Sequence, residues 1–113
     1  MPSQYTIVQY LPNPISGERI NIGAIAFDSQ TTLVYFLKSW DRVKAFAGQD
    51  RDIGFLHYFV ERITRETEEG KLKPHNIIQM TKNINSIQLT EPYWSLESVE
   101  VLLSEIVRDF LVE

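Results

Sequence analysis

The sequence predicts a single α+β domain over residues 1–113: a three-stranded antiparallel meander, extended by a short fourth strand and packed by three to four helices. Three observations predict this class. β-branched and aromatic segments follow one another near the N-terminus with short turns between them. The second half of the chain repeats apolar residues at helical spacing. Hydrophobic residues make up 43% and charged residues 23%, which is typical of one globular domain of this length.

The first three strands are expected at 4–11, 19–27 and 32–38. Pro12 and Pro14 lie in the first link, where they fix φ and remove backbone donors, and Gly17 permits a positive φ. The second link is a short turn. Short links between successive strands favour an antiparallel meander, so the expected order of elements is β-β-β-α-α-(α)-β-α.

The predicted strands carry apolar residues on both faces. In the first strand, Tyr5 and Ile7 point one way, and Val8 and Tyr10 point the other. A sheet with two apolar faces needs cover on both. Helices can cover one face; the other needs a further helix, a ligand or a partner chain, which includes a homodimer through that face.

The helices are predicted from their end signals. Ser39 is expected to N-cap a short helix that Gly48 ends. Asp50 or Asp52 is expected to cap the next helix, which Gly70 ends.

Later in the chain, Pro74 is expected to begin another short helix, and 86–90 reads as a fourth strand that Pro92 breaks. Ser95 is expected to N-cap the last helix. The core stripe of that helix is expected to hold Val99, Leu102, Leu103, Ile106 and Phe110.

Charge and composition argue against several functions. The net charge is −4, and the acidity lies in residues 91–113, where Arg108 is the only basic residue. Nucleic-acid binding needs a clustered basic face, so we expect no nucleic-acid partner. The chain has no cysteine, which excludes disulfides and thiolate sites and suits a cytoplasmic location. We see no signal peptide, and no segment approaches the roughly 20 apolar residues that span a bilayer.

The sequence shows no catalytic constellation. His57 and His75 stand without neighbouring carboxylates or histidines at ligand spacing, so we expect no metal site and no cofactor. No serine lies in a Gly-x-Ser-x-Gly elbow. A Glu-x-Lys fragment at 69–71 resembles one in metal-dependent nucleases, but it lies at a predicted helix end and reads as a solvated terminus.

The segment GERINIG, residues 17–23, has two glycines six residues apart. It lacks the lysine and hydroxyl of a P-loop and leads into a strand, so we interpret it as the turn and first half of a hairpin. Gly23 indicates a bulge or the close approach of an aromatic side chain. Asn21 is expected on the same face as Gly23, where it must find a hydrogen bond and could tie down the proline-rich loop.

A second candidate segment begins the first predicted helix. Trp40 followed by Asp41 and Arg42 could form an aromatic anchor with a polar rim, although a capped helix buried through Trp40 explains it more simply. The ligand or interface candidates from both segments are Glu18, Arg19, Asn21, Gly23, Trp40, Asp41 and Arg42.

Three segments together resemble a known family. They are YTIVQYLPNPISGERINIGAIAFD, FLKSWDRVKAF and IQLTEP, followed by an amphipathic helix. In this order they are similar to the small bacterial proteins grouped as domain of unknown function 3037. The positions that match the family pattern are Tyr10, Pro12, Pro14, Gly17, Glu18, Asn21, Gly23, Trp40, Arg42 and Pro92. The resemblance implies no established activity. It does imply a partner, because genes of the family often lie beside genes for kinases similar to the HipA toxin family.

The leading functional hypothesis is therefore a non-catalytic protein-interaction or regulatory module, with another protein or a second copy as its partner. The rival is a small enzyme or ligand-binding domain with a polar site near 17–23 and 40–42. A pocket that gathers those candidate side chains would favour the rival, and separately satisfied side chains would argue against it.

Overall fold

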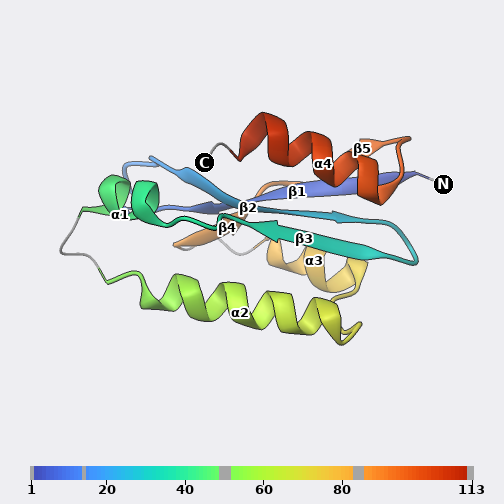
Figure 1. Cartoon of the computed structure of the whole chain (residues 1–113), viewed down its shortest axis with the longest axis horizontal. Coiled ribbons are helices and arrows are strands. Elements are labelled where there is room, and N and C mark those ends of the chain that lie inside the picture. Colours follow the sequence, from blue (N-terminus) through green and yellow to red (C-terminus); the bar gives the residue numbers. More distant parts are fainter. Residues whose placement is uncertain (1, 14, 49–51, 83–85, 112–113) are drawn as a thin grey trace.

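The computed structural model describes residues 2–13, 15–48, 52–82 and 86–111. These residues form one five-stranded antiparallel sheet and four helices (Figure 1). In chain order the elements are β1 (Ser3–Tyr10), β2 (Ile20–Phe27), β3 (Thr32–Phe36), α1 (Asp41–Ala47), α2 (Gly54–Glu68), α3 (Pro74–Met80), β4 (Ile87–Leu89), β5 (Tyr93–Ser95) and α4 (Val99–Phe110). The α+β class and the N-terminal meander predicted from the sequence are confirmed.

The central strand of the sheet is β1. Its neighbours are β2 along one edge and the two short strands β4 and β5 along the other, so the order is β3-β2-β1-β4, with β5 also on β1. Thr90 joins β4 to β5 and keeps the ladder continuous: its N–H donates to the Ile7 carbonyl oxygen at 3.0 Å, and its Oγ1 accepts from the Ile7 N–H at 2.9 Å. Strand β5 was not predicted from the sequence, because Pro92 breaks the strand signal just before it.

Helices cover both faces of the sheet. Figure 1 shows α4 on one face and α2 with α3 on the other. The buried residues of these helices are Val99, Leu102 and Ile106 in α4, Leu56 and Ile63 in α2, and Ile77 in α3. The second apolar face is therefore covered by further helices of the chain itself, one of the alternatives left open by the sequence.

A β-bulge divides β2 into two parts with opposite orientations. Val8 of β1 pairs with Gly23, but the next residue, Gln9, pairs with Asn21, so Ile22 is the extra residue. Paired residues of antiparallel strands share a face. An extra residue in β2 therefore places the residues before it on the face opposite to the one that regular alternation from Gly23 would give. The expectation that Asn21 and Gly23 share a face was wrong: Asn21 points to the α4 side and Gly23 to the α2 side.

Gly23 lies directly beneath an aromatic ring, as one of the two sequence readings predicted. A Cβ built there would stand 2.6 Å from Phe36 Cε1 and 2.9 Å from the Tyr35 carbonyl oxygen. The Phe36 ring in turn packs edge-on against Phe59 of α2, with ring centroids 6.4 Å apart. Glycine at this position lets β3 hold its phenylalanine against α2.

Two predicted helix caps were wrong. Helix α1 begins at Asp41, and its N-cap position is Trp40, without a side-chain cap bond, one residue after the expected Ser39. Helix α4 is capped by Ser98, whose Oγ accepts from the Val101 N–H at 3.3 Å. Ser95 instead belongs to β5, because that segment completes the ladder on β1.

Three other end signals agree with the structure. Gly48 and Gly70 follow the ends of α1 and α2, and Pro74 begins α3. The N-cap position of α2 is Ile53, without a side-chain cap bond, and Asp52 lies one residue earlier, where its Oδ1 accepts from the Gly54 N–H at 2.8 Å. Asp50 lies outside the described residues. Phe110, expected in the core stripe of α4, is exposed.

Candidate functional site

One hollow gathers three of the seven candidate residues. Arg19, Asn21 and Arg42 line it, from the start of β2 and the first turn of α1. Its volume is about 220 Å³. We call it the polar hollow; its complete lining is Arg19, Ile20, Asn21, Leu37, Arg42 and Phe110. Residues from three separate parts of the chain therefore meet here, where α1 and the end of α4 lie at one end of the molecule (Figure 1).

A chain of hydrogen bonds holds two of these side chains in place. Arg19 Nη1 donates to Gln9 Oε1 at 3.4 Å, and Arg19 Nε donates to the Gly17 carbonyl oxygen at 3.2 Å. Gln9 Nε2 donates to Asn21 Oδ1 at 3.0 Å, and Asn21 Nδ2 donates to the Phe110 carbonyl oxygen at 3.2 Å. Asn21 thus ties β2 to the last residue of α4, instead of the proline-rich loop, because the bulge turns it to that side.

The remaining candidates lie elsewhere. Glu18 and Asp41 are exposed and do not line the hollow, although each precedes an arginine that does. Gly23 is buried beneath Phe36. Trp40 packs against the His57 ring, with centroids 4.7 Å apart. The structure therefore brings together only part of the predicted polar site.

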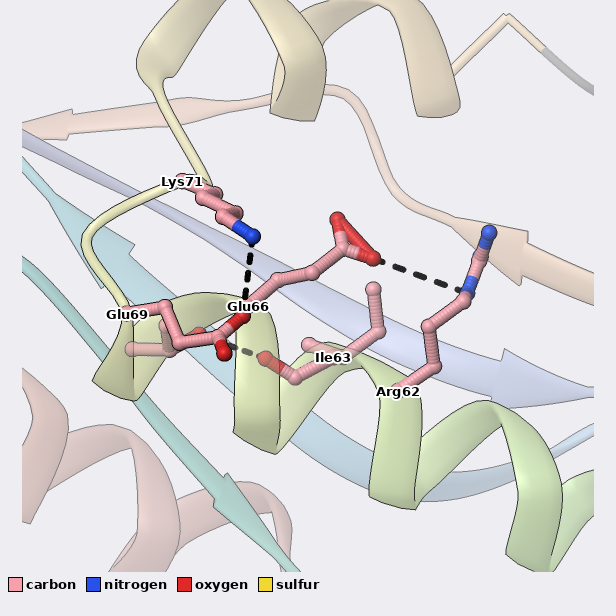
Figure 2. A network of polar contacts seen from close by, with 6 residues as sticks. Arg62, Ile63, Glu66, Glu69 and Lys71 are labelled. Atoms are coloured by element: carbon pink, nitrogen blue, oxygen red, sulfur yellow. Dashed lines mark hydrogen bonds and ion pairs between the residues drawn. The ribbon is translucent and has the colours of Figure 1, made fainter.

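Within 2–13, 15–48, 52–82 and 86–111, no group of three or more His, Asp or Glu side chains could hold a metal ion. The Glu-x-Lys fragment lies just after α2, where Lys71 Nζ is 3.3 Å from the Glu69 carboxylate (Figure 2). One turn earlier, Arg62 and Glu66 form a second pair at 3.9 Å along the exposed side of the helix. These pairs are surface contacts that contribute little stability.

A second surface feature was not assigned as a site from the sequence. Tyr93, Trp94 and Leu96 are 53%, 69% and 91% exposed, and they follow one another on and just after β5. We call these three residues the aromatic edge. Tyr93 stacks on Tyr5 of β1 with ring centroids 5.1 Å apart, and burial, with the neighbouring Tyr93, raises the pKa of Tyr5.

Trp94 stands between two hollows on the α3 side of the sheet. The larger, about 610 Å³, lies between α3 and the β4–β5 edge, and Ile78 of α3 lines it with Trp94. The smaller, about 330 Å³, lies between Trp94, Phe27 and Pro74. The sequence signal for this feature is the pair Tyr93–Trp94, between a strand-breaking proline and a helix cap. From the sequence alone this segment looks like a link between a strand and a helix, because the fifth strand is not predicted.

The fold and these two surface features define a small α+β domain, with a polar hollow at one end and exposed aromatic residues toward the other. A family model described as "Protein of unknown function (DUF3037)" matches residues 5–107. The chain belongs to this family, as the sequence motifs indicated. The matched range contains the whole aromatic edge and every lining residue of the polar hollow except Phe110.

Two further comparisons gave no match, one with curated proteins and one with solved structures. Among the helices of the described ranges, none combines the length and the apolar character needed to cross a bilayer.

Proposed function

We propose that this protein is a non-catalytic interaction or regulatory module that binds another protein through the aromatic edge. The observation that supports it best is the exposure of Tyr93, Trp94 and Leu96 on and just after β5, one of the two short strands that pair with the outer edge of β1. Tyr93 lies opposite Tyr5 and Trp94 opposite Gln4, so the two aromatic side chains of β5 point to opposite faces of the sheet, and a partner at this edge could contact both. Tryptophan and tyrosine are also the residues most enriched among interface hot spots.

The surroundings of Trp94 suit a polypeptide partner. The larger hollow beside it is lined by side-chain amides and hydroxyls, with one lysine and one glutamate, and by a few apolar groups; the polar members are Gln4, Thr81, Lys82, Gln88, Thr90 and Glu91. Amides and hydroxyls can both donate to and accept from peptide groups. An aromatic anchor with a polar rim is the usual make-up of a protein interface. The net charge of −4 speaks against a nucleic acid, and we expect no salt-sensitive retention on DNA or RNA.

The partner could be a different protein or a second copy. The family resemblance makes a kinase similar to the HipA family the first partner to test, with the present chain as its small regulatory subunit. A homodimer through the aromatic edge would cover the same side chains.

The test is site-specific crosslinking. A photo-crosslinking amino acid replaces Leu96, which is almost fully exposed, and the tagged protein is irradiated in its native cell, purified and measured by light scattering. We expect one crosslinked protein in stoichiometric amount, and loss of that product in Trp94→Ala. The matched control is Tyr58→Ala, because Tyr58 is 66% exposed on α2 and lies outside the aromatic edge. Equal crosslinking with and without Trp94, or none at all, would contradict the proposal.

The rival function, binding of a small ligand, has one specific observation in its favour. The polar hollow does bring Arg19, Asn21 and Arg42 together. It involves none of the residues of the aromatic edge, so both surfaces can operate in the same molecule.

A further inference from the structure

We infer that the polar hollow, with Arg19, Asn21 and Arg42 in its wall, binds a compact oxyanion, a carboxylate or phosphate group. The inference goes beyond the proposed function. It concerns other residues, and neither result depends on the other.

The first argument is the orientation of Arg19. The guanidinium donates to the Gly17 carbonyl oxygen and to Gln9 Oε1, both on the protein. A guanidinium has five N–H donors, so donors remain for a ligand after these two bonds are made. The Gln9 amide is itself oriented, because its Nε2 donates to Asn21 Oδ1 at 3.0 Å. A side chain held in this way loses less conformational entropy when it binds.

The second argument is the local charge. The chain as a whole is acidic, yet the charged residues that line the hollow are both arginines. Glu18 and Asp41 precede them in the chain but do not line the hollow. Cationic side chains in the wall of a hollow attract an anion that enters it, and charges beyond about 8 Å contribute little because salt screens them at physiological ionic strength.

The third argument concerns a backbone carbonyl at the hollow that would repel an anion. The carbonyl oxygens at the end of a helix carry a partial negative charge and lack partners within the helix. The Phe110 carbonyl oxygen of α4 is such a group, and it lies at the hollow. Asn21 Nδ2 donates to it, which satisfies the carbonyl, and the second N–H of the same amide group is left for an anion.

The fourth argument is size. A volume of about 220 Å³ is smaller than the roughly 300–1,000 Å³ of pockets for drug-sized ligands. The hollow has room for one carboxylate or phosphate group. Guanidinium groups bind both anions with paired N–H donors. The anion could be a free metabolite or an acidic side chain of a bound protein, and the chemistry of recognition is the same.

The experiment is an NMR titration of the ¹⁵N-labelled full chain at constant ionic strength. The probes are inorganic phosphate, succinate and a neutral-flanked peptide with one glutamate. The reporters are the Arg19 Nε–H and the Asn21 side-chain amide, which lie on the hollow itself. We expect saturable shifts at both reporters with at least one probe. Saturation by phosphate or succinate identifies a free anion, and saturation by the peptide alone identifies a partner's side chain.

The variants separate specific binding from general attraction. Arg42→Gln is expected to weaken binding by at least about tenfold, the least that losing a charge-assisted hydrogen bond should cost. Arg65→Gln removes the same charge from an exposed position on α2 and should leave the affinity unchanged. The inference is overturned if none of the probes gives a saturable shift at the reporters, or if the two variants weaken binding equally. Trp94→Ala should leave the titration unchanged, so this result is independent of the partner experiment.

Discussion

Replacing Gly23 by alanine tests whether this glycine is needed to make room for the Phe36 ring. The new Cβ would lie 2.6 Å from Phe36 Cε1 and 2.9 Å from the Tyr35 carbonyl oxygen, so either the ring or strand β3 must move. Overpacking of this kind costs about 1–3 kcal/mol. Moving the ring also disturbs its edge-on contact with Phe59, which is worth about 0.5–1.5 kcal/mol. The lower entropy of the unfolded alanine chain returns about 0.4–1 kcal/mol.

The net expectation is a loss of about 2 kcal/mol in the free energy of unfolding, from the midpoints of those three ranges. Urea unfolding followed by far-ultraviolet circular dichroism measures it. The same Gly23→Ala change made in a Phe36→Leu background should cost clearly less, because the smaller side chain leaves room for the methyl group. Equal losses in the two backgrounds would refute the reasoning, since they would show that the ring is not what Gly23 accommodates.

Three further predictions concern α4 and its contacts. Asn21→Ala removes the donor to the Phe110 carbonyl oxygen and should cost about 1 kcal/mol in urea unfolding, whereas no loss would show that water replaces the amide fully. Ser98→Ala removes the N-cap of α4 and should cost about 1 kcal/mol, and Ser98→Asp should restore most of it; a stable alanine variant would contradict the assigned cap. The hydrogen bond with Glu105 raises the pKa of Glu97, with burial adding to it. Because the pKa of Glu97 is higher in the folded than in the unfolded protein, its protonated form stabilises the folded state. This contribution is complete below the unfolded-state pKa and is lost as the pH rises through the folded-state pKa. Carboxyl ¹³C NMR should show the Glu97 pKa falling in Glu105→Gln, and an unchanged pKa would exclude the pairing.

Much of the fold was predictable because its signals are local. The meander follows from β-branched segments joined by short links, and the ends of α1 and α2 follow from Gly48 and Gly70. The two misplaced caps show where local reasoning stops. Ser95 and Ser98 have the same residue type three positions apart, and only the pairing of Ser95 with Ser3 on β1 decides which of them begins the helix.

Part of the candidate site was predictable from the sequence, because some of its signals are also local. Sequence reading found Arg19, Asn21 and Arg42 as polar residues in strongly patterned segments, and the structure gathers them at one hollow. It could not find Phe110, which comes from a distant helix and was expected in the core. The sequence prediction also placed Asn21 on the wrong face. A bulge depends on how two strands pair, and the sequence of one strand does not show it reliably.

The bulge at Ile22 also determines where the chain can change in length. Before β2, in the link that follows β1, an added or lost residue needs only a rebuilt turn. Between Ile20 and Gly23, losing Ile22 would restore regular pairing and keep Asn21 opposite Gln9 on the α4 side, but it would remove a side chain that is fully buried in the core. Natural or engineered variants of this domain should therefore vary freely in the length of the first link and keep a fixed number of residues across the bulge.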